Sequence, residues 1–294
     1  MRGAIFSSIL LVGACGCSSE AQLGDAGSGS DAGGADAAAA PDAGETDGAT
    51  VADDAAVAGD VSSSDDLDHD GLADADELRM ASEYLPFLSL SPTDACTRSG
   101  ILFRMRPHPD DASRIAVTMV VLYETDCGAG GHVGDDEVFG MTIDPTRPAP
   151  EGILAIRTIA HQNTACEAVT DCGAGCGLAA CTTGTRRGAP YPMIFASRDK
   201  HGWYAHEAQC DNACFFTNQC DVAPTGAEPM VLNAGEPGSP LVRNLTTAGM
   251  ITAGSGWTEA SLFDFDPWSD MDFGGAGNVT SDLVDAAFLT PVCP

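Results

Sequence analysis

Short apolar runs rich in β-branched residues recur between residues 101 and 197, and clusters of Gly, Pro and Asp separate them. This pattern is typical of strands joined by turns and loops. Many short strands with long loops favour an all-β fold, specifically a β-sandwich. The expected strands cover residues 101–106, 115–123, 137–144, 152–160 and 192–197.

A helical period precedes these runs. Leu78, Ala81, Ser82 and Leu85 recur at i, i+3, i+4 and i+7, and Pro86 follows them. Such spacing places the four residues on one face of a helix, which the proline ends. We therefore expect one short N-terminal helix that buries this face.

The first 17 residues resemble a bacterial lipoprotein signal. Arg2 precedes the apolar run 5–12, and small residues with Cys15 and Cys17 follow it. The run is far shorter than the roughly 20 residues that span a bilayer. A cysteine after small residues favours acylation of Cys17, or of Cys15. The alternative is an ordinary cleaved signal peptide.

Residues 18–65 contain mainly Ala, Gly, Asp and Ser and have no aromatic residue. Such a segment buries too little apolar surface to offset the entropy of ordering, so it predicts a disordered acidic stalk. We expect a single globular domain, residues 78–294, beyond it.

Ten cysteines remain after the two near the N-terminus, and an even number in an exported chain predicts disulfides. Their spacing lacks the paired CxxC pattern of zinc sites, and several lie in an expected insertion at residues 162–190. The candidates are Cys96, Cys127, Cys166, Cys172, Cys176, Cys181, Cys210, Cys214, Cys220 and Cys293.

The formal net charge of −30 changes the expected partners. A field of this sign repels phosphate backbones, so nucleic acid is excluded, whereas cations are attracted.

Residues 66–77 match the pattern of an EF-hand-type calcium loop. Acids occupy positions 1, 3, 5, 9 and 12, and glycine occupies position 6. Hard carboxylate oxygens suit Ca²⁺, and glycine permits the sharp turn. We expect a lone loop without an entering helix; the alternative is the acidic end of a linker. The predicted ligands are Asp66, Asp68, Asp70, Asp74 and Glu77.

A second cation site is expected at the start of the strand near residue 137. Asp135 and Glu137 lie two residues apart, so a strand projects both to one face. His132 and Asp126 precede them in a glycine-rich turn. Carboxylates with an imidazole suit Ca²⁺, Mg²⁺ or Mn²⁺ better than zinc.

The segment His132–Glu137, HVGDDE, resembles the H-x-G-D-W-E signature of the vacuolar protein sorting-associated protein 62 family, with Asp136 replacing its tryptophan. Segments 81–88, 159–162 and 192–202 resemble three further segments of that family in the same order. The resemblance adds His161 and His201 as candidate ligands.

The same spacing resembles the necrosis- and ethylene-inducing-like proteins, which are secreted β-sandwich cytolysins. Asp126, His132, Asp135 and Glu137 match, in order, the ligand types that hold a divalent cation near sphingolipid in that family. Neither resemblance implies an established enzymatic reaction.

These observations predict an exported protein, lipid-anchored at the outer membrane or cell surface. Its domain would bind lipid or glycan headgroups in a metal-dependent way. Two alternatives remain: a metal-dependent hydrolase with His161 or His201 as general base, and a structural envelope protein whose cations only hold loops.

Overall fold

The computed structural model describes residues 65–96, 98–128, 130–162, 164–173, 178–211, 218–251, 266–269, 272–273 and 277–293. The expected signal sequence with Cys15 and Cys17 lies outside these residues, as do nearly all of the stalk, Cys176 and Cys214.

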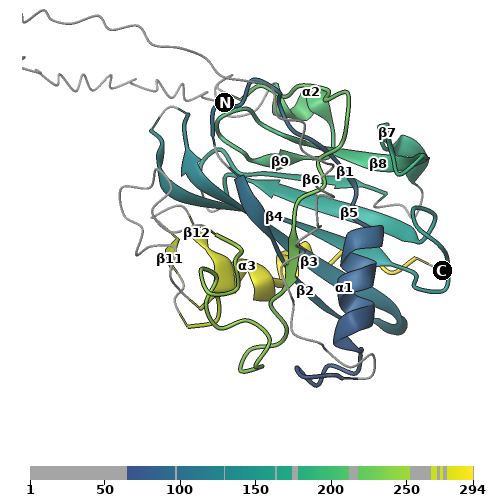
Figure 1. The fold of residues 1–294 in the computed structure, drawn as a ribbon. Coiled ribbons are helices and arrows are strands. Elements are labelled where there is room, and N and C mark those ends of the chain that lie inside the picture. Colours follow the sequence, from purple (N-terminus) through teal and green to yellow (C-terminus); the bar gives the residue numbers. More distant parts are fainter. Residues whose placement is uncertain are drawn as a thin grey trace, which may run out of the picture. The chain divides into compact units, whose positions relative to one another are not determined.

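The largest element is a six-stranded sheet in the order β10-β2-β3-β4-β5-β6, in which β10 pairs in parallel with β2 and the other pairs are antiparallel (Figure 1). Its strands are β2 (Arg98–His108), β3 (Asp111–Asp126), β4 (His132–Ile143), β5 (Ile153–Ala160), β6 (Ala168–Cys172) and β10 (Val231–Asn233).

A second sheet faces it. Strand β8 (Ala189–Ala196) pairs with β1 (Phe87–Ser89), β7 (Thr183–Arg186) and β9 (Trp203–Tyr204). A two-stranded pair, β11 (Asp272–Phe273) and β12 (Gly277–Asn278), stands apart. The helices are α1 (Asp74–Glu83), α2 (Glu207–Cys210) and α3 (Val279–Val284), with 3₁₀ turns η1 (Leu178–Ala180) and η4 (Ala286–Phe288). None of the helices in the described part of the chain is long and apolar enough to cross a membrane.

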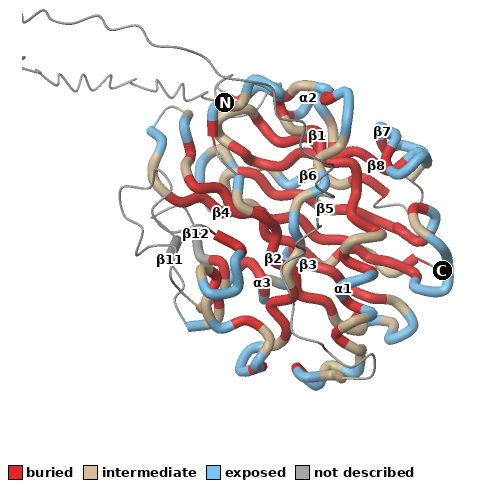
Figure 2. The backbone as a smooth tube through the Cα atoms, in the orientation of Figure 1, coloured by how far each residue is buried: buried red, intermediate tan, exposed pale blue. Residues whose placement is uncertain are grey.

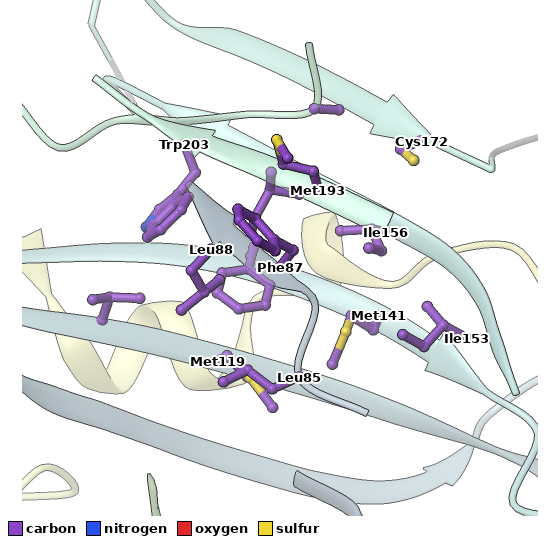
Figure 3. Close-up of a cluster of buried hydrophobic side chains, with 14 of the residues drawn as sticks. Leu85, Phe87, Leu88, Met119, Met141, Ile153, Ile156, Cys172, Met193 and Trp203 are labelled. Atoms are coloured by element: carbon purple, nitrogen blue, oxygen red, sulfur yellow. The ribbon is translucent and has the colours of Figure 1, made fainter. Parts of the chain in front are cut away.

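The main hydrophobic core lies between the two sheets. Phe87 and Met193 project from the smaller sheet, and Met119, Met141 and Ile156 project from the larger one; all are nearly inaccessible to solvent (Figure 3). Burial of apolar side chains from two facing sheets is the defining feature of a sandwich. The all-β prediction is therefore confirmed, together with one short N-terminal helix.

The larger sheet is buried on its outer face as well. Leu122 and Val138, which point away from the main core, pack with Leu245, Leu283 and Phe288 from the C-terminal third of the chain. Figure 2 shows the central strands as buried along most of their length. The long apolar runs of β3 and β4 follow from this, since a strand covered on both faces has no polar alternation.

The structure buries only part of the predicted helix face, namely Ala81 in α1 and Leu85 just after the helix. Leu78 is 38% exposed, whereas Asp74, Glu77, Met80 and Ala81 point inward. The helix is rotated because its first inward-facing residues are acids that belong to the preceding loop.

Helix α1 is held to the smaller sheet at its C-terminal end. The buried Arg186 of β7 donates hydrogen bonds to the carbonyls of Ser82 and Glu83, and the Tyr191 hydroxyl also donates to Glu83. These donors satisfy carbonyls that the end of a helix leaves unpaired. The position of α1, and of the loop before it, is therefore fixed.

The expected insertion at 162–190 contains two strands, β6 and β7. Neither has an apolar run, because β6 is a sheet edge with Val169 half-exposed and β7 is four residues long. The sequence pattern therefore gave no signal for them.

We expect Leu122→Ala to destabilise the protein by about 2–5 kcal/mol, because the substitution leaves a cavity under the C-terminal layer. The matched variant Leu78→Ala should change the unfolding free energy by less than about 0.5 kcal/mol, since Leu78 is exposed. Guanidinium denaturation with the disulfides intact measures both. Equal effects would contradict this description of the outer face.

Candidate functional site

The loop 66–77 folds with its acids inward. Gly71 adopts φ +96° and donates its amide to Asp66 Oδ2 at 3.1 Å. The Leu72 amide donates to Asp70 Oδ1 at 2.7 Å, and the Leu72 side chain packs against the main core. A positive φ at position 6 is the conformation for which glycine was expected there. The turn therefore holds the carboxylates of Asp66 and Asp70 through backbone amides.

Four carboxylate oxygens of this loop are buried without a hydrogen-bond partner in the described structure. They are Asp66 Oδ1, Asp68 Oδ1, Asp70 Oδ2 and Glu77 Oε1. Ligand atoms of Asp66, Asp68 and Asp70 lie within 4.8 Å of one another, as do those of Asp68, Asp74 and Glu77. Buried polar atoms are normally paired, so these oxygens lack a counter-group. Their number and chemistry fit Ca²⁺.

The pKa values of the loop's acids also indicate that these carboxylates lack a counter-charge. Burial, together with the neighbouring acids, raises the pKa of Glu77 to about 9 and that of Asp70 to about 7. Burial likewise raises the pKa of Asp68 to about 6. The metal-free loop therefore retains protons that a bound cation would displace.

Of the residues predicted for the second site, Asp135 and His201 are in direct contact. His201 Nδ1 lies 2.7 Å from Asp135 Oδ2, and its Nε2 lies 3.5 Å from Asp94 Oδ2. The imidazole is completely buried and stacks on Tyr123, with ring centroids 3.7 Å apart. Burial lowers the pKa of His201, but the two carboxylates outweigh it and raise the pKa to about 9. His201 is therefore an imidazolium held between two carboxylates.

Asp126 is paired with a cation of the protein itself. Its Oδ2 accepts a hydrogen bond from Lys200 Nζ, and His132 Nε2 lies 3.8 Å from the same oxygen. His132 Nδ1 lies 2.7 Å from the carbonyl of Gly134. This carboxylate is thus already neutralised by an ammonium group.

Two chain segments bring these groups together. The disulfide between Cys96 and Cys127 joins the segment after β1 to the end of β3. Asp199 then accepts amide hydrogen bonds from both, at its Oδ1 from Ala95 (3.1 Å) and at its carbonyl from Gly128 (2.7 Å). The loop that carries Lys200 and His201 is held in this way.

His161 lies beside the cluster. Asn218 Nδ2 lies 2.7 Å from His161 Nε2 and donates to the Tyr204 hydroxyl at 2.6 Å. Burial lowers the pKa of His161, which is therefore neutral at pH 7. His161 and His201 have φ values of 54° and 58°. Such conformations are unfavourable for side chains with a Cβ and concentrate at functional sites.

Glu137 projects to the same face as Asp135. Its side chain retains some solvent access, although burial and the charges of Asp135 and Asp136 raise its pKa well above the ordinary value. Asp136 points to the opposite face, where it lies beside the buried Asp282 of α3.

The structure brings these residues into one region without assembling them as a ligand set. Among the described residues, His132, Glu137 and His161 belong to no cluster of three ligand atoms within 4.8 Å. Asp94 and His201 form such a cluster with Cys96, whose sulfur is in a disulfide and cannot act as a thiolate ligand.

Asp94, Lys200, Tyr123 and Asn218 were missed by the sequence reasoning. Asp94 precedes Cys96 by two residues and Lys200 precedes His201 by one, so adjacency was the one signal available. No local pattern predicts which partners the fold supplies.

The cysteines support the predicted disulfides. Pairs Cys96–Cys127, Cys172–Cys181 and Cys210–Cys220 are bonded, and Cys166 and Cys293 are also disulfide-bonded. Disulfides of this number indicate an oxidising compartment.

No family model, curated protein or solved structure matches the chain. The two family resemblances therefore stay expectations.

The second cation site remains a prediction with a direct test. In a Glu77→Gln background, which removes a predicted ligand of the calcium loop, titration with Ca²⁺, Mg²⁺ and Mn²⁺ should show binding that Glu137→Gln or Asp135→Asn abolishes. The reason is that a cation would offset the repulsion between these acids. Calorimetry measures the binding, and Asp171→Asn on the edge strand β6 is a control. If no heat is observed at millimolar metal, these residues form only the internal ion-pair network.

Proposed function

We propose that the protein is a calcium-dependent binding module of the cell exterior, held at a membrane by acylated Cys17 or Cys15. Ca²⁺ occupies the loop 66–77 and completes the fold of the domain. The observation that carries the proposal is that four carboxylate oxygens of this loop are buried without a partner, and that its acids form two groups of close ligand atoms that share Asp68. The disulfides are consistent with export, where millimolar-range calcium sites are common.

The ligand of the module is proposed to be a lipid or glycan headgroup that binds near Glu137. Glu137 is half-buried and lies close to Tyr204. The pKa of Tyr204 is raised chiefly by burial and further by the charge of Glu137. A cation at Glu137 and Asp135 would bridge an anionic or hydroxyl-bearing headgroup to a protein of net charge −30.

A metal-dependent hydrolase is a second candidate function. The neutral His161, which has a left-handed backbone conformation, would act as a proton acceptor beside these acids once a substrate displaces Asn218 Nδ2 from its Nε2. Turnover of an ester or phosphodiester that requires added metal and is lost in His161→Ala would favour this candidate. Binding to vesicles or glycans without turnover would favour the binding module.

We expect calcium to raise the melting temperature of the EDTA-treated full-length protein. Binding at about 100 times Kd stabilises a folded protein by about 2.7 kcal/mol, which corresponds to roughly 5–10 °C for a domain of this size. Glu77→Gln should abolish the calcium-induced shift, whereas Asp76→Asn should retain it, because the neighbouring Asp76 is exposed and pairs with Arg79. Differential scanning calorimetry measures both shifts. An equal loss in the two variants would count against the loop as the site.

The calcium effect should depend on pH. In the metal-free protein, the raised pKa values of Asp68, Asp70 and Glu77 mean that the folded state binds protons more tightly than the unfolded state. Their contribution to stability is therefore present at low pH and is lost as pH rises from about 4 to about 9. Apparent calcium affinity should rise over pH 6–9, with protons released on binding, as calorimetry in buffers of different ionisation enthalpy would measure. A pH-independent affinity would contradict the assignment of these ligands.

A further inference from the structure

A chain segment remote in sequence contacts the calcium loop. Strand β10 ends at Asn233, and the turn after it, residues 233–236, lies against Asp68 and Glu77. The loop 66–77 is therefore in contact with residues that lie outside its own 12-residue sequence pattern.

Asn233 donates from Nδ2 to Glu77 Oε2 at 3.0 Å. Its own Oδ1 accepts the Gly235 amide at 2.9 Å, which fixes the orientation of the side-chain amide. Both Asn233 and Glu77 are buried, at 8% and 0% exposure. Asn233 is thus the hydrogen-bond donor to one carboxylate oxygen of Glu77, and the other oxygen, Oε1, is left without a partner.

The backbone of Glu236 acts on Asp68 in the same way. Its amide donates to Asp68 Oδ2 at 3.1 Å, and Asp68 Oδ1 is the unpartnered oxygen. Segment 233–236 therefore holds each of the two carboxylates at one oxygen and leaves the other oxygen unpartnered. Ligand atoms of Asp68 and Glu77 lie within 4.8 Å of each other and of Asp74.

This approach requires a glycine. Gly235 has φ +63°, and a Cβ there would lie 3.1 Å from Asp68 Oδ2 and 2.6 Å from Ser239 Oγ. Leu241 Cδ1 would also lie 2.8 Å from this Cβ, so a side chain here would displace the turn that carries the Glu236 amide as well as strain its backbone.

The segment is anchored independently of the loop. The Ala234 amide donates to the Phe103 carbonyl of β2 at 2.7 Å, and Trp268 Nε1 donates to the Ala234 carbonyl at 2.7 Å. The Glu236 carboxylate is paired with the buried Arg104. Because the larger sheet holds it, segment 233–236 can act as a rigid template for the loop.

We propose that the cation site is bipartite: loop 66–77 supplies the ligands, and Asn233 with the backbone at Gly235 and Glu236 positions two of them. This inference rests on the proposed calcium binding and adds the residues that set its affinity. Groups that orient metal ligands typically change metal affinity by about 10–100-fold when they are removed.

The test is calorimetric titration of CaCl₂ into the EDTA-treated full-length protein, at a temperature where circular dichroism shows every variant folded. Asn233→Ala and Gly235→Ala should each weaken binding by about 10–100-fold. Two matched controls should bind like the parent. Asn244→Ala is the first control. It removes a side-chain oxygen, Asn244 Oδ1, that accepts a hydrogen bond from the Thr247 amide away from the loop. Gly238→Ala is the second control. It changes another glycine with a positive φ (+88°), but there an added Cβ would meet no atom within 4 Å.

Parent-like affinity in both Asn233→Ala and Gly235→Ala would overturn the bipartite site while leaving calcium binding intact. Absence of binding by the parent would overturn both proposals. Amide hydrogen exchange of the parent provides a second measurement if a variant does not fold. Calcium should slow exchange in residues 233–239 together with 66–83, and protection confined to 66–83 would refute the positioning role.

Discussion

Repulsion between buried carboxylates that lack a counter-charge is the constraint around which this domain is organised. The loop 66–77 brings acids together and leaves oxygens of Asp66, Asp68, Asp70 and Glu77 without donors. Desolvation alone makes such an arrangement unfavourable unless protons or a cation neutralise it. Glu77 and Asp74 of this loop lie in the first turn of α1, whose other inward-facing side chains join the main core. The attachment of the N-terminal part of the domain therefore depends on how this charge is compensated.

The negative charge is compensated differently in the two acidic regions, which are the groups around His201 and the loop 66–77. Around His201, the protein supplies its own cations: Lys200 pairs with Asp126, and the imidazolium lies between Asp94 and Asp135. In the loop, the contacts to Asp68 and Glu77 come from an amide side chain and a backbone N–H, which carry no formal charge. A region neutralised internally tolerates the absence of metal, whereas one supported only by dipoles gains more from binding a metal. The loop is therefore the region where a bound calcium ion would stabilise the protein most.

How much could be predicted from the sequence depends on how local each feature is. The acidic turn of residues 66–77 could be predicted, because its carboxylates and its glycine lie within 12 residues. The long strands could be predicted, because burial on both faces gives continuous apolar runs. The inward face of α1 could not, because the fold turns the acids Asp74 and Glu77 inward, so that Leu78 is exposed. The pairing of Lys200 with Asp126 and of Asp94 with His201 could not either, because sequence spacing does not specify contacts between distant segments.

The parallel pairing of β10 with β2 has a consequence for the order in which the protein can mature. The contacts from Asn233 to Glu77 and from Glu236 to Asp68 join residues 156 and 168 positions apart. A chain made from its N-terminus presents the acidic loop long before the segment that orients it exists. Until the last third of the polypeptide arrives, the loop lacks its template and the outer face of the larger sheet lacks its cover. Tight occupancy of the loop would then report that synthesis has passed residues 233–236, and a product that ends before them would expose both an unneutralised acidic loop and an apolar sheet face.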